Sequence, residues 1–379
     1  MLDVMVLTEI ADIGQDDWDR CFAGEAENWA FYHATEKAGI PAFDWFYIVV
    51  HEDGQPRALV PGFVTDYRLD TTVQGPLKRW TERLTRWLPG LMTLRLVSLG
   101  SPVAEICHIG FAPGLPDDQK NAAVTLVFQA LERIAAARQA GLVAIKDADP
   151  QFGARIDRLA RGYKMLPGLP TALLPLGVGS LEEYLSRLSR ATRKDMKRKW
   201  KHAADLRIER RTDVSDVIDE IADLYAQTVS HSDLRFEYLP PGFFSRLLQE
   251  MDGQAYCFLY WAAERLVAFN LVIQGKDRLI DKYIGINYPD VPRYSPYFVS
   301  WLNNVDFCIR NGLPIYQAGQ AFYGTKLRLG CRLMPTRQYF RHRNPAVNLV
   351  LRIVSWIVRL DRHDPHVGSA MPVPEGAER

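Results

Sequence analysis

Two stretches of the chain alternate apolar runs with short polar breaks, as β-hairpins do. In the first, the runs FYIVV and ALVPGFV flank HEDGQPR, whose Asp53-Gly54 step is a strong hairpin-turn signal. In the second, YCFLYWAA and LVAFNLVI flank Glu264-Arg265, and a third run, LIDKYIGI, follows the polar segment around Lys276. The pattern predicts antiparallel strands at corresponding places in the two halves of the chain.

The elements that follow the hairpins also match between the halves. LVFQALERIAAARQAG runs into LVAIKDAD, and FVSWLNNVDFCIRNG runs into LPIYQAG, so each half has a helix stopped by glycine and then a buried strand. ARIDRLARGYKMLP and GTKLRLGCRLMP then both predict a helix, a glycine (Gly162, Gly330) and a strand. We expect two diverged copies of one α/β unit. Their boundary is expected near residue 177, just before a helix that Ser180 can cap.

The first copy is longer than the second. The step from Arg57 to Gly162 spans 105 residues and that from Arg265 to Gly330 spans 65, which leaves an insertion of about 40 residues at about 67–105. Within it, apolar residues recur at helical spacing with Lys and Arg between them, a pattern typical of a helix lying in a membrane interface. The expected membrane contacts are Trp80, Leu84 and Trp87. The alternative is a helix packed on the protein's own core.

Composition narrows the class of protein. Lys and Arg (46) nearly balance Asp and Glu (45) in 379 residues, which argues against a protein that coats nucleic acid over its whole surface. The five cysteines are scattered without ligand spacing, so we expect neither disulfides nor a metal. No apolar run is long enough to span a bilayer, and the N-terminus does not resemble a signal peptide. A cytoplasmic protein, peripheral on the inner membrane, is expected.

Positive charge is concentrated in one predicted helix from Leu185 to Ala203. Asp195 is the only acidic residue inside its basic run. Such a stripe attracts a carrier protein's acidic surface, the phosphates of CoA, a tRNA backbone or anionic lipid; a solvated helix face is the alternative. The basic residues are Arg187, Arg190, Arg193, Lys194, Lys197, Arg198, Lys199 and Lys201.

The second half resembles a known superfamily. The segments that carry the resemblance are SLEEYLSRLSRATRKDMKRKWK, YIGINYPDVPRYSPYF and NGLPIYQAGQAFYGTKLRLGC, within roughly 180–345. They resemble the GNAT acyl-N-transferases, specifically the FemAB-like type with two such domains in tandem, and the first half follows more loosely. The resemblance implies an α/β (α+β) fold with two GNAT-like domains, each a mixed, largely antiparallel sheet flanked by helices. The expected domains are 1–177, 178–345 and a C-terminal helix with a loose tail at 346–379.

One segment departs from the family pattern. Many acetyl-CoA-dependent members carry a Gly-rich turn at a helix N-terminus, whose backbone N–H groups bind the pyrophosphate of CoA. The corresponding segment here, Pro292 to Tyr297, contains no glycine. The sequence therefore favours a different acyl carrier, or a different mode of binding CoA.

Candidate catalytic residues follow from the chemistry of N-acyl transfer. The reaction needs a neutral amine, a stabilised oxyanion and a protonated leaving group. The resulting catalytic candidates are Glu105, His108, Tyr283, Tyr323 and Lys326. For the strand residues the alternative is a plain sheet face, and for His108 a hydrogen-bonded histidine in a turn. The candidates for binding substrate or carrier are Asp281, Lys282, Arg293, Tyr294, Gln317, Gln320, Arg193 and Lys197.

A second polar cluster, His231 with Asp233 and Arg235, is a weaker candidate.

The leading hypothesis is an N-acyltransferase that uses acyl-CoA or an acyl carrier protein and acts on a lipid-like amine at an anionic membrane surface, as bacterial ceramide synthases do. The alternative is a FemAB-type enzyme that takes an amino acid from charged tRNA and adds it to a peptidoglycan precursor or peptide. A non-catalytic membrane-binding protein is the third hypothesis.

Overall fold

The computed structural model describes residues 2–68, 93–231, 237–349 and 351. Its contacts divide the chain into two compact units, each built from segments that are separated in the sequence. The first unit comprises Met1–Ala23, Pro41–Pro170 and Pro335–Arg379, and the second comprises Gly24–Ile40 and Thr171–Met334. The expected membrane contacts Trp80, Leu84 and Trp87, together with Asp233, Arg235 and the tail beyond residue 351, lie outside the described residues.

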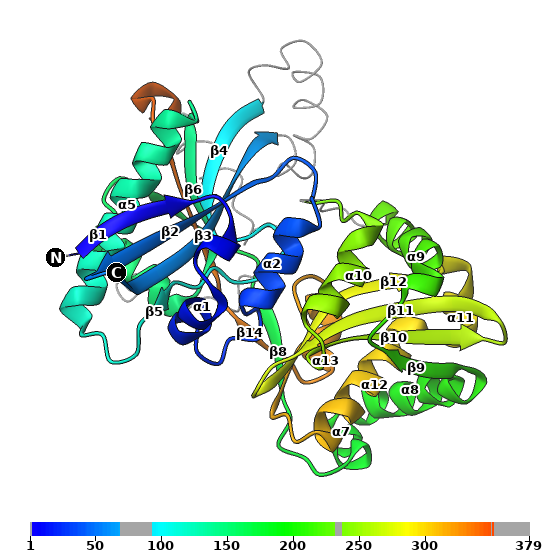
Figure 1. The fold of residues 1–379 in the computed structure, drawn as a ribbon. Helices are drawn as coiled ribbons and strands as arrows, with labels where there is room; N and C mark the ends of the chain where they lie inside the picture. Colours follow the sequence, from blue (N-terminus) through cyan, green and yellow to red (C-terminus); the bar gives the residue numbers. More distant parts are fainter. Residues whose placement is uncertain (1, 69–92, 232–236, 350, 352–379) are drawn as a thin grey trace. The chain divides into compact units, whose positions relative to one another are not determined.

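The first unit is a mixed sheet with helices packed on it (Figure 1). In its described part the strand order is β1-β2-β3-β4-β6-β15-β7, with β5 beside β3, and only the pair β4–β6 is parallel. The strands are β1 (Leu2–Leu7), β2 (Asp44–Glu52), β3 (Gln55–Arg68), β4 (Thr93–Leu99), β5 (Gly110–Phe111), β6 (Leu142–Ala148), β7 (Lys164–Pro167) and β15 (Arg337–His342), and the helices are η1 (Ile10–Asp12), α1 (Gln15–Cys21), α5 (Asp117–Ala137) and α6 (Pro150–Leu159).

The second unit repeats this plan with the order β14-β8-β13-β12-β11-β10-β9, in which the described pair β12–β13 is the parallel one. Its strands are β8 (Thr171–Pro175), β9 (Arg207–Arg211), β10 (Ala255–Ala262), β11 (Arg265–Gln274), β12 (Arg278–Ile286), β13 (Ile315–Gln317) and β14 (Arg332–Met334). Its helices are α2 (Trp29–Lys37), α7 (Leu181–Arg187), α8 (Arg190–Trp200), η3 (Lys201–Asp205), η4 (Ser215–Val217), α9 (Ile218–Ser230), α10 (Pro241–Glu250), η5 (Tyr288–Asp290), α11 (Val291–Tyr294), α12 (Pro296–Arg310) and α13 (Tyr323–Arg328).

The internal repeat predicted from the sequence is present in both units. Asp53 (φ 52°) and Gly54 (φ 74°) form the turn between β2 and β3, as the Asp-Gly signal predicts for a hairpin. Gly162 and Gly330 both have positive φ values (97° and 95°) where a helix ends and a short strand follows. The α/β fold class with two similar units is therefore confirmed.

A helix on each sheet supplies much of the core. On α5, Val124, Val127 and Leu131 are fully buried and recur at intervals of three and four residues, so one face of the helix packs on the first sheet. On α12, Val299, Leu302 and Val305 do the same for the second sheet. The corresponding helices of the two copies thus cover their sheets by the same apolar periodicity.

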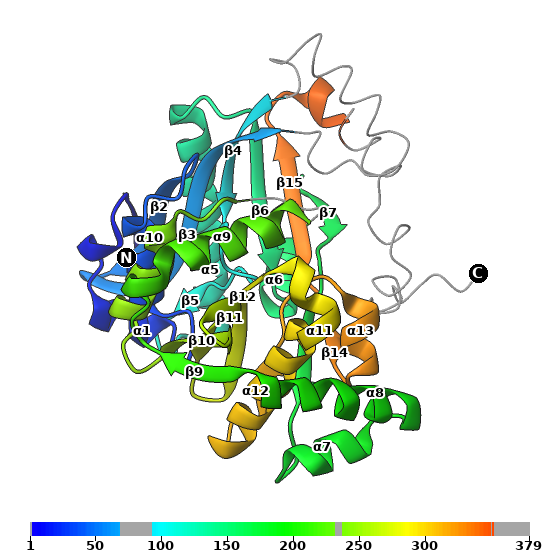
Figure 2. The same cartoon turned by 90° about the vertical axis from the view of Figure 1, so that its right-hand side faces the viewer.

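The units differ from the contiguous ranges 1–177 and 178–345 expected from the sequence, because two segments are exchanged. Strand β15 follows the whole second unit in the chain, yet it pairs with β6 and β7 of the first sheet (Figure 2). Tyr339, at the centre of β15, is buried in the first unit's core. Residues 24–40, which carry α2, belong to the second unit, where Asn28 bonds Gln254 and His33 lies 3.2 Å from Glu250.

Tyr339→Phe tests the exchange of β15. The Tyr339 hydroxyl has two acceptors within reach on α6, Gly153 O (3.0 Å) and Asp157 Oδ1 (2.9 Å), so its removal deletes hydrogen bonding between β15 and α6 of the first unit. We expect the free energy of unfolding to fall by about 1–3 kcal/mol in urea denaturation. Tyr256→Phe, which loses a bond to Gly253 O near the surface, is the control and should cost less. Equal losses in the two variants would contradict the assignment.

Candidate active site

Strands β12 and β13 are paired over a short distance only. Their parallel ladder contains three described pairs and ends at Ile280 and Gln317, whereas β12 continues to Ile286 along β11. In the first unit, β4 pairs with β6 up to Leu99 and Ile145, and Cys107 then continues along β6 with its N–H donating to Asp147 O (2.8 Å). In the first unit, the position beside β6 beyond the end of the β4 ladder is therefore taken by the segment at Cys107. In the second unit, β13 does not pair with β12 beyond Gln317.

A β-bulge lies where β12 leaves β13. Leu271 of β11 pairs with Tyr283 and its neighbour Val272 pairs with Asp281, so Lys282 is the extra residue. The bulge turns Lys282 and Tyr283 toward α2, α9 and α10. The Lys282 ammonium lies 2.5 Å from Glu27 and 4.9 Å from the ring of Phe31.

The Lys282 side chain is 2% exposed although the residue is half-buried, so its remaining exposure lies in the backbone of the bulge. The backbone at this point of β12 is therefore partly accessible.

Asp281, before the bulge, anchors a buried polar network on the α12 side of the sheet. Its carboxylate accepts hydrogen bonds from Asn270 Nδ2 and from the Tyr316 hydroxyl, both at 2.6 Å. Asn304 of α12 donates to Asn270 Oδ1 (2.7 Å) and to the Tyr316 hydroxyl (3.2 Å). Burial raises the pKa of Asp281, and the bonds from Tyr316 and Asn270 together with the charge of Lys326 limit the rise.

Helix α13 brings Tyr323 and Lys326 into the interior. Their residue exposures are 3% and 4%, and they lie on one face because they are three residues apart. The Lys326 ammonium donates to Gln320 O (3.0 Å). Gln317, at the end of β13, is buried and accepts from Arg278 (3.5 Å).

Tyr283 lies on the face of β12 opposite to Asp281. Its hydroxyl donates to Glu237 (3.3 Å), and its ring packs against the rings of Tyr225 and Phe243. Burial raises the pKa of Tyr283 well above its usual value, so this phenol stays protonated.

The structure brings the second-half candidates together in one unit. Tyr294 is buried in α11, with the guanidinium of the exposed Arg293 over its ring. Lys199 of α8 lies 3.3 Å from the ring centroid of Phe298, which places α8 beside the start of α12. On α8, Arg193 donates to Ser186 O (2.9 Å), and Lys197 is exposed.

Glu105 and His108, by contrast, lie in the first unit. His108 Nδ1 is 3.5 Å from Asp149 Oδ2, and Asp149 also caps α6 by accepting from the N–H groups of Gln151 and Phe152. Burial disfavours the charge of Asp149, but these hydrogen bonds outweigh it and lower the pKa. The sequence analysis missed Asp149, although an Asp immediately before Pro150 is an N-cap signal.

His231, from the weaker candidate cluster, is stacked on Tyr288 with ring centroids 3.7 Å apart, and its Nδ1 lies 2.9 Å from Gln227 O.

Other residues of the site were also missed. Asn270 and Asn304 interrupt the apolar runs LVAFNLVI and FVSWLNNVDF, and an amide in a buried run is a sign of a polar network. Glu27 and Glu237 carry no such local signal, because they reach β12 from distant parts of the chain.

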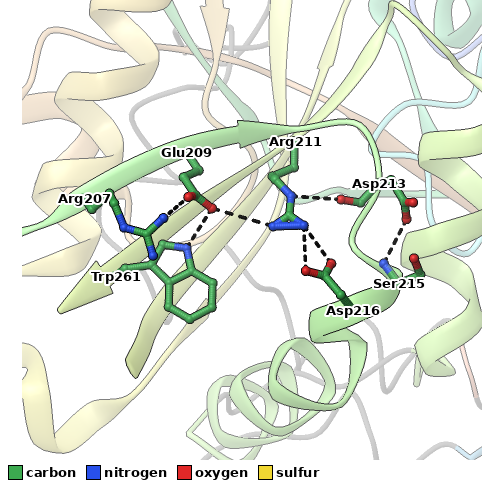
Figure 3. A network of polar contacts seen from close by, with 7 residues as sticks. All are labelled: Arg207, Glu209, Arg211, Asp213, Ser215, Asp216 and Trp261. Atoms are coloured by element: carbon green, nitrogen blue, oxygen red, sulfur yellow. Dashed lines mark hydrogen bonds and ion pairs between the residues drawn. The ribbon is translucent and has the colours of Figure 1, made fainter. Parts of the chain in front are cut away.

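The edge strand β9 carries a separate ion-pair network (Figure 3). Glu209 pairs with Arg207 and Arg211 and accepts from Trp261 Nε1 (3.1 Å), and Arg211 also binds Asp216 (2.7 Å). Arg207 and Arg211 of this strand are thus paired with acidic side chains. Within the described residues, no group of three or more His, Cys, Asp or Glu side chains is placed to hold a metal ion, and no helix is long and apolar enough to cross a membrane.

The buried ion pair between Glu27 and Lys282 can be tested by a double-mutant cycle. Glu27→Gln or Lys282→Met alone leaves a charge without its partner in a low-dielectric site, so each should cost about 3–5 kcal/mol in denaturant unfolding. The double variant should lose less than the sum. The exposed pair Glu183–Arg187 is the control, expected to couple by about 0.5 kcal/mol. Additive losses for Glu27 and Lys282 would show that they do not interact.

Comparison with known proteins places the second unit in a family. Residues 190–324 match the family model of the acetyltransferase (GNAT) domain, which covers α8 to the start of α13 and so includes β12 and β13. No curated protein matches the chain.

Several solved structures share the fold of almost the whole chain. The crystal structure of FemX is 12% identical with a TM-score of 0.53, over 85% of this chain and 98% of that one. A tandem GNAT protein from the clavulanic acid biosynthesis pathway is 11% identical with a TM-score of 0.54, over 91% and 99%. L-PGS from Bacillus licheniformis is 9% identical with a TM-score of 0.51, over 86% and 92%. The chain therefore has a tandem GNAT fold, and its second unit contains a GNAT-type acetyltransferase domain.

Proposed function

We propose that the protein is an N-acyltransferase that moves an acyl group from acyl-CoA or an acyl carrier protein to the amine of an amphipathic, sphingoid-like substrate at a membrane surface. The GNAT match over residues 190–324 supports acyl transfer by the second unit. The observation that carries the proposal is the early end of the β12–β13 ladder at Ile280 and Gln317, next to the bulge at Lys282.

An exposed strand edge can pair with an extended chain that carries amides. The pantetheine arm shared by CoA and acyl carrier proteins is such a chain, with its thioester at the end. Paired along β12 beyond Ile280, it would place the thioester near the Asp281 network. The first unit has no corresponding opening in its described part, because Cys107 already follows β6 there. We therefore place the donor in the second unit.

In the reaction, the amine nitrogen attacks the thioester carbonyl, the C–S bond breaks, and the thiolate takes a proton while the nitrogen loses one. Tyr323 and Lys326 on α13 and Tyr283 on β12 are the proposed catalytic groups in the second unit, and Asp281 positions β12 through Asn270 and Tyr316. In the first unit, Glu105 and His108 remain candidate general bases, and Asp149 Oδ2 lies 3.5 Å from Nδ1 of the His108 imidazole.

The proposed donor contacts do not depend on a Gly-rich turn. Ser295, between α11 and α12, adopts a left-handed conformation (φ 49°, ψ 51°) that glycine usually supplies. Arg293, Tyr294, Gln317 and Gln320 flank this junction or the end of β13 and are the proposed donor-binding residues, and Arg193 and Lys197 on α8 are the proposed contacts for carrier phosphates. The lipid-like acceptor and the peripheral membrane location rest on the sequence pattern around Trp80, Leu84 and Trp87.

An assay of thiol release tests the proposed reaction. The purified chain should release CoA from long-chain acyl-CoA only when a sphingoid amine is added, with the amide product identified by mass spectrometry. Lys326→Met should lower kcat/KM by about 10²-fold because the leaving group loses a nearby cation. Lys164→Met, on exposed β7 of the first unit, is the control and should change little.

Tyr323→Phe serves as a second variant in case Lys326→Met unfolds. Absence of thiol release with every amine tested would overturn the proposed function. Equal activity of the Lys326 and Lys164 variants would overturn the role of Lys326.

One observation favours a FemAB-type reaction with charged tRNA as the second candidate. Arg190, Lys194, Lys197 and Lys201 are exposed and recur every three or four residues, so they form one basic face from α8 into η3. Asp195 pairs with Arg198 and Lys199, and within the described part of the chain Lys194 and Lys197 have no acidic partner. A phosphate backbone would complement this face.

Ribonuclease separates the two donors. Product formation in a crude extract should persist after ribonuclease treatment, because a thioester donor contains no RNA strand. Loss of product, restored by adding charged tRNA, would instead support the FemAB-type reaction. Purified protein that binds membranes without forming product from either donor would support the non-catalytic alternative.

A further inference from the structure

Tyr297, the second residue of α12, holds a buried polar group that no residue described in the structure satisfies. Its hydroxyl oxygen is inaccessible to solvent and has no hydrogen-bond partner among the described residues. The hydroxyls of Tyr184, Tyr283 and Tyr316, also in the second unit, each donate to a protein oxygen. An unpaired buried hydroxyl loses its hydrogen bonds to water without replacement, so its retention calls for an explanation beyond packing.

The ring of Tyr297 is held in place by its neighbours. Phe298, Trp301 and Phe322 lie with ring centroids 5.3, 6.5 and 6.2 Å away. Pro296 and the left-handed Ser295 fix the start of the helix that carries it. These neighbours pack around the ring whose hydroxyl is buried.

The surroundings of Tyr297 keep it a hydrogen-bond donor. Burial raises its pKa, and the negative charges of Asp281 and, when ionised, Cys331 add to the effect. Because the charge of Asp281 affects the pKa of Tyr297, the Tyr297 phenol and the Asp281 carboxylate lie in the same region of the second unit. Because the negative charge of Asp281 is felt at this position, an uncharged acceptor such as a carbonyl oxygen suits the site better than a phosphate.

Phe322, in contact with Tyr297, has two unusual properties. It is 73% exposed, which places a large apolar ring in solvent. It also has a positive φ (53°), directly after Ala321 (69°), a backbone conformation that is strained for a non-glycine residue. Such strain is found at binding sites, where the rest of the fold maintains it. The exposed ring and the unpaired hydroxyl together form an amphipathic site.

We propose that the Tyr297 hydroxyl donates a hydrogen bond to a carbonyl oxygen of the bound acyl donor, and that Phe322 covers the apolar part of the donor arm beside it. This inference rests on the proposed function and names two donor-binding residues that the sequence analysis did not identify. The pantetheine thioester fits the site because its amide and thioester carbonyls alternate with apolar methylene groups and carry no charge.

Tyr297→Phe in the full-length protein tests the inference. Without ligand, the variant should melt at the same temperature as the wild type or higher, because no protein hydrogen bond is lost. With acetyl-CoA as the probe, the dissociation constant of the variant, measured by calorimetry, should be about tenfold higher than that of the wild type, because one hydrogen bond to the ligand is lost. Phe322→Ala should also weaken acetyl-CoA binding without lowering the melting temperature, and Phe322→Leu should restore part of the affinity.

Tyr256→Phe is the matched control, because its hydroxyl donates to Gly253 O (2.7 Å) in the free protein. It should leave the affinity for acetyl-CoA unchanged.

The outcomes separate this inference from the proposed function. If the wild type binds acetyl-CoA and Tyr297→Phe binds it equally well, the role of Tyr297 is wrong while the donor assignment stands. A fall in melting temperature of ligand-free Tyr297→Phe would show that the hydroxyl is already paired, which also overturns the inference. If the wild type binds neither acetyl-CoA nor an acylated carrier protein, the proposed donor itself is wrong and the inference fails with it.

Discussion

The second unit depends on the pairing of one strand. β12 is bonded along its whole length to β11 but to β13 at three positions only. A buried strand that loses a neighbour must satisfy its backbone groups in some other way, since unpaired N–H and C=O groups are costly inside a protein. The bulge at Lys282 allows solvent to reach the backbone there, while the side chains of Asp281 and Tyr283 on either side stay inside the unit. Everything proposed about the donor follows from that one unpaired edge.

Polar networks hold β12 from its two faces. The Asp281 network ties β11, β12, β13 and α12 together, and the Lys282–Glu27 pair ties the bulge to the segment before α2. Buried networks of this kind add rigidity when each member is satisfied. They also explain why the strand can leave its neighbour without fraying. The Tyr297 hydroxyl is near enough to the first network for the charge of Asp281 to raise its pKa, and it has no hydrogen-bond partner among the described residues.

Local patterns in the sequence predict most of the fold. Asp53-Gly54 marks the first hairpin, and Gly162 and Gly330 mark equivalent helix ends, because each signal depends on residues adjacent in the chain. The exchange of β15 was not predicted, since the alternation in RQYFRH fits either sheet equally well. The candidate site was predicted only in part, because some of its residues are neighbours in space but far apart in the sequence. Asp281 and Lys282 lie on a recognisable strand, but Glu27 reaches Lys282 from 255 residues away.

The place of β15 has a consequence for how the chain is made. On the ribosome, β6 and β7 emerge long before Arg337, so the first sheet lacks the strand between β6 and β7 until almost the entire polypeptide has been synthesised. A nascent chain would expose two unpaired strand edges during that interval, which is the condition that favours aggregation or chaperone capture. A shortened gene ending after β14 would leave the same gap permanently.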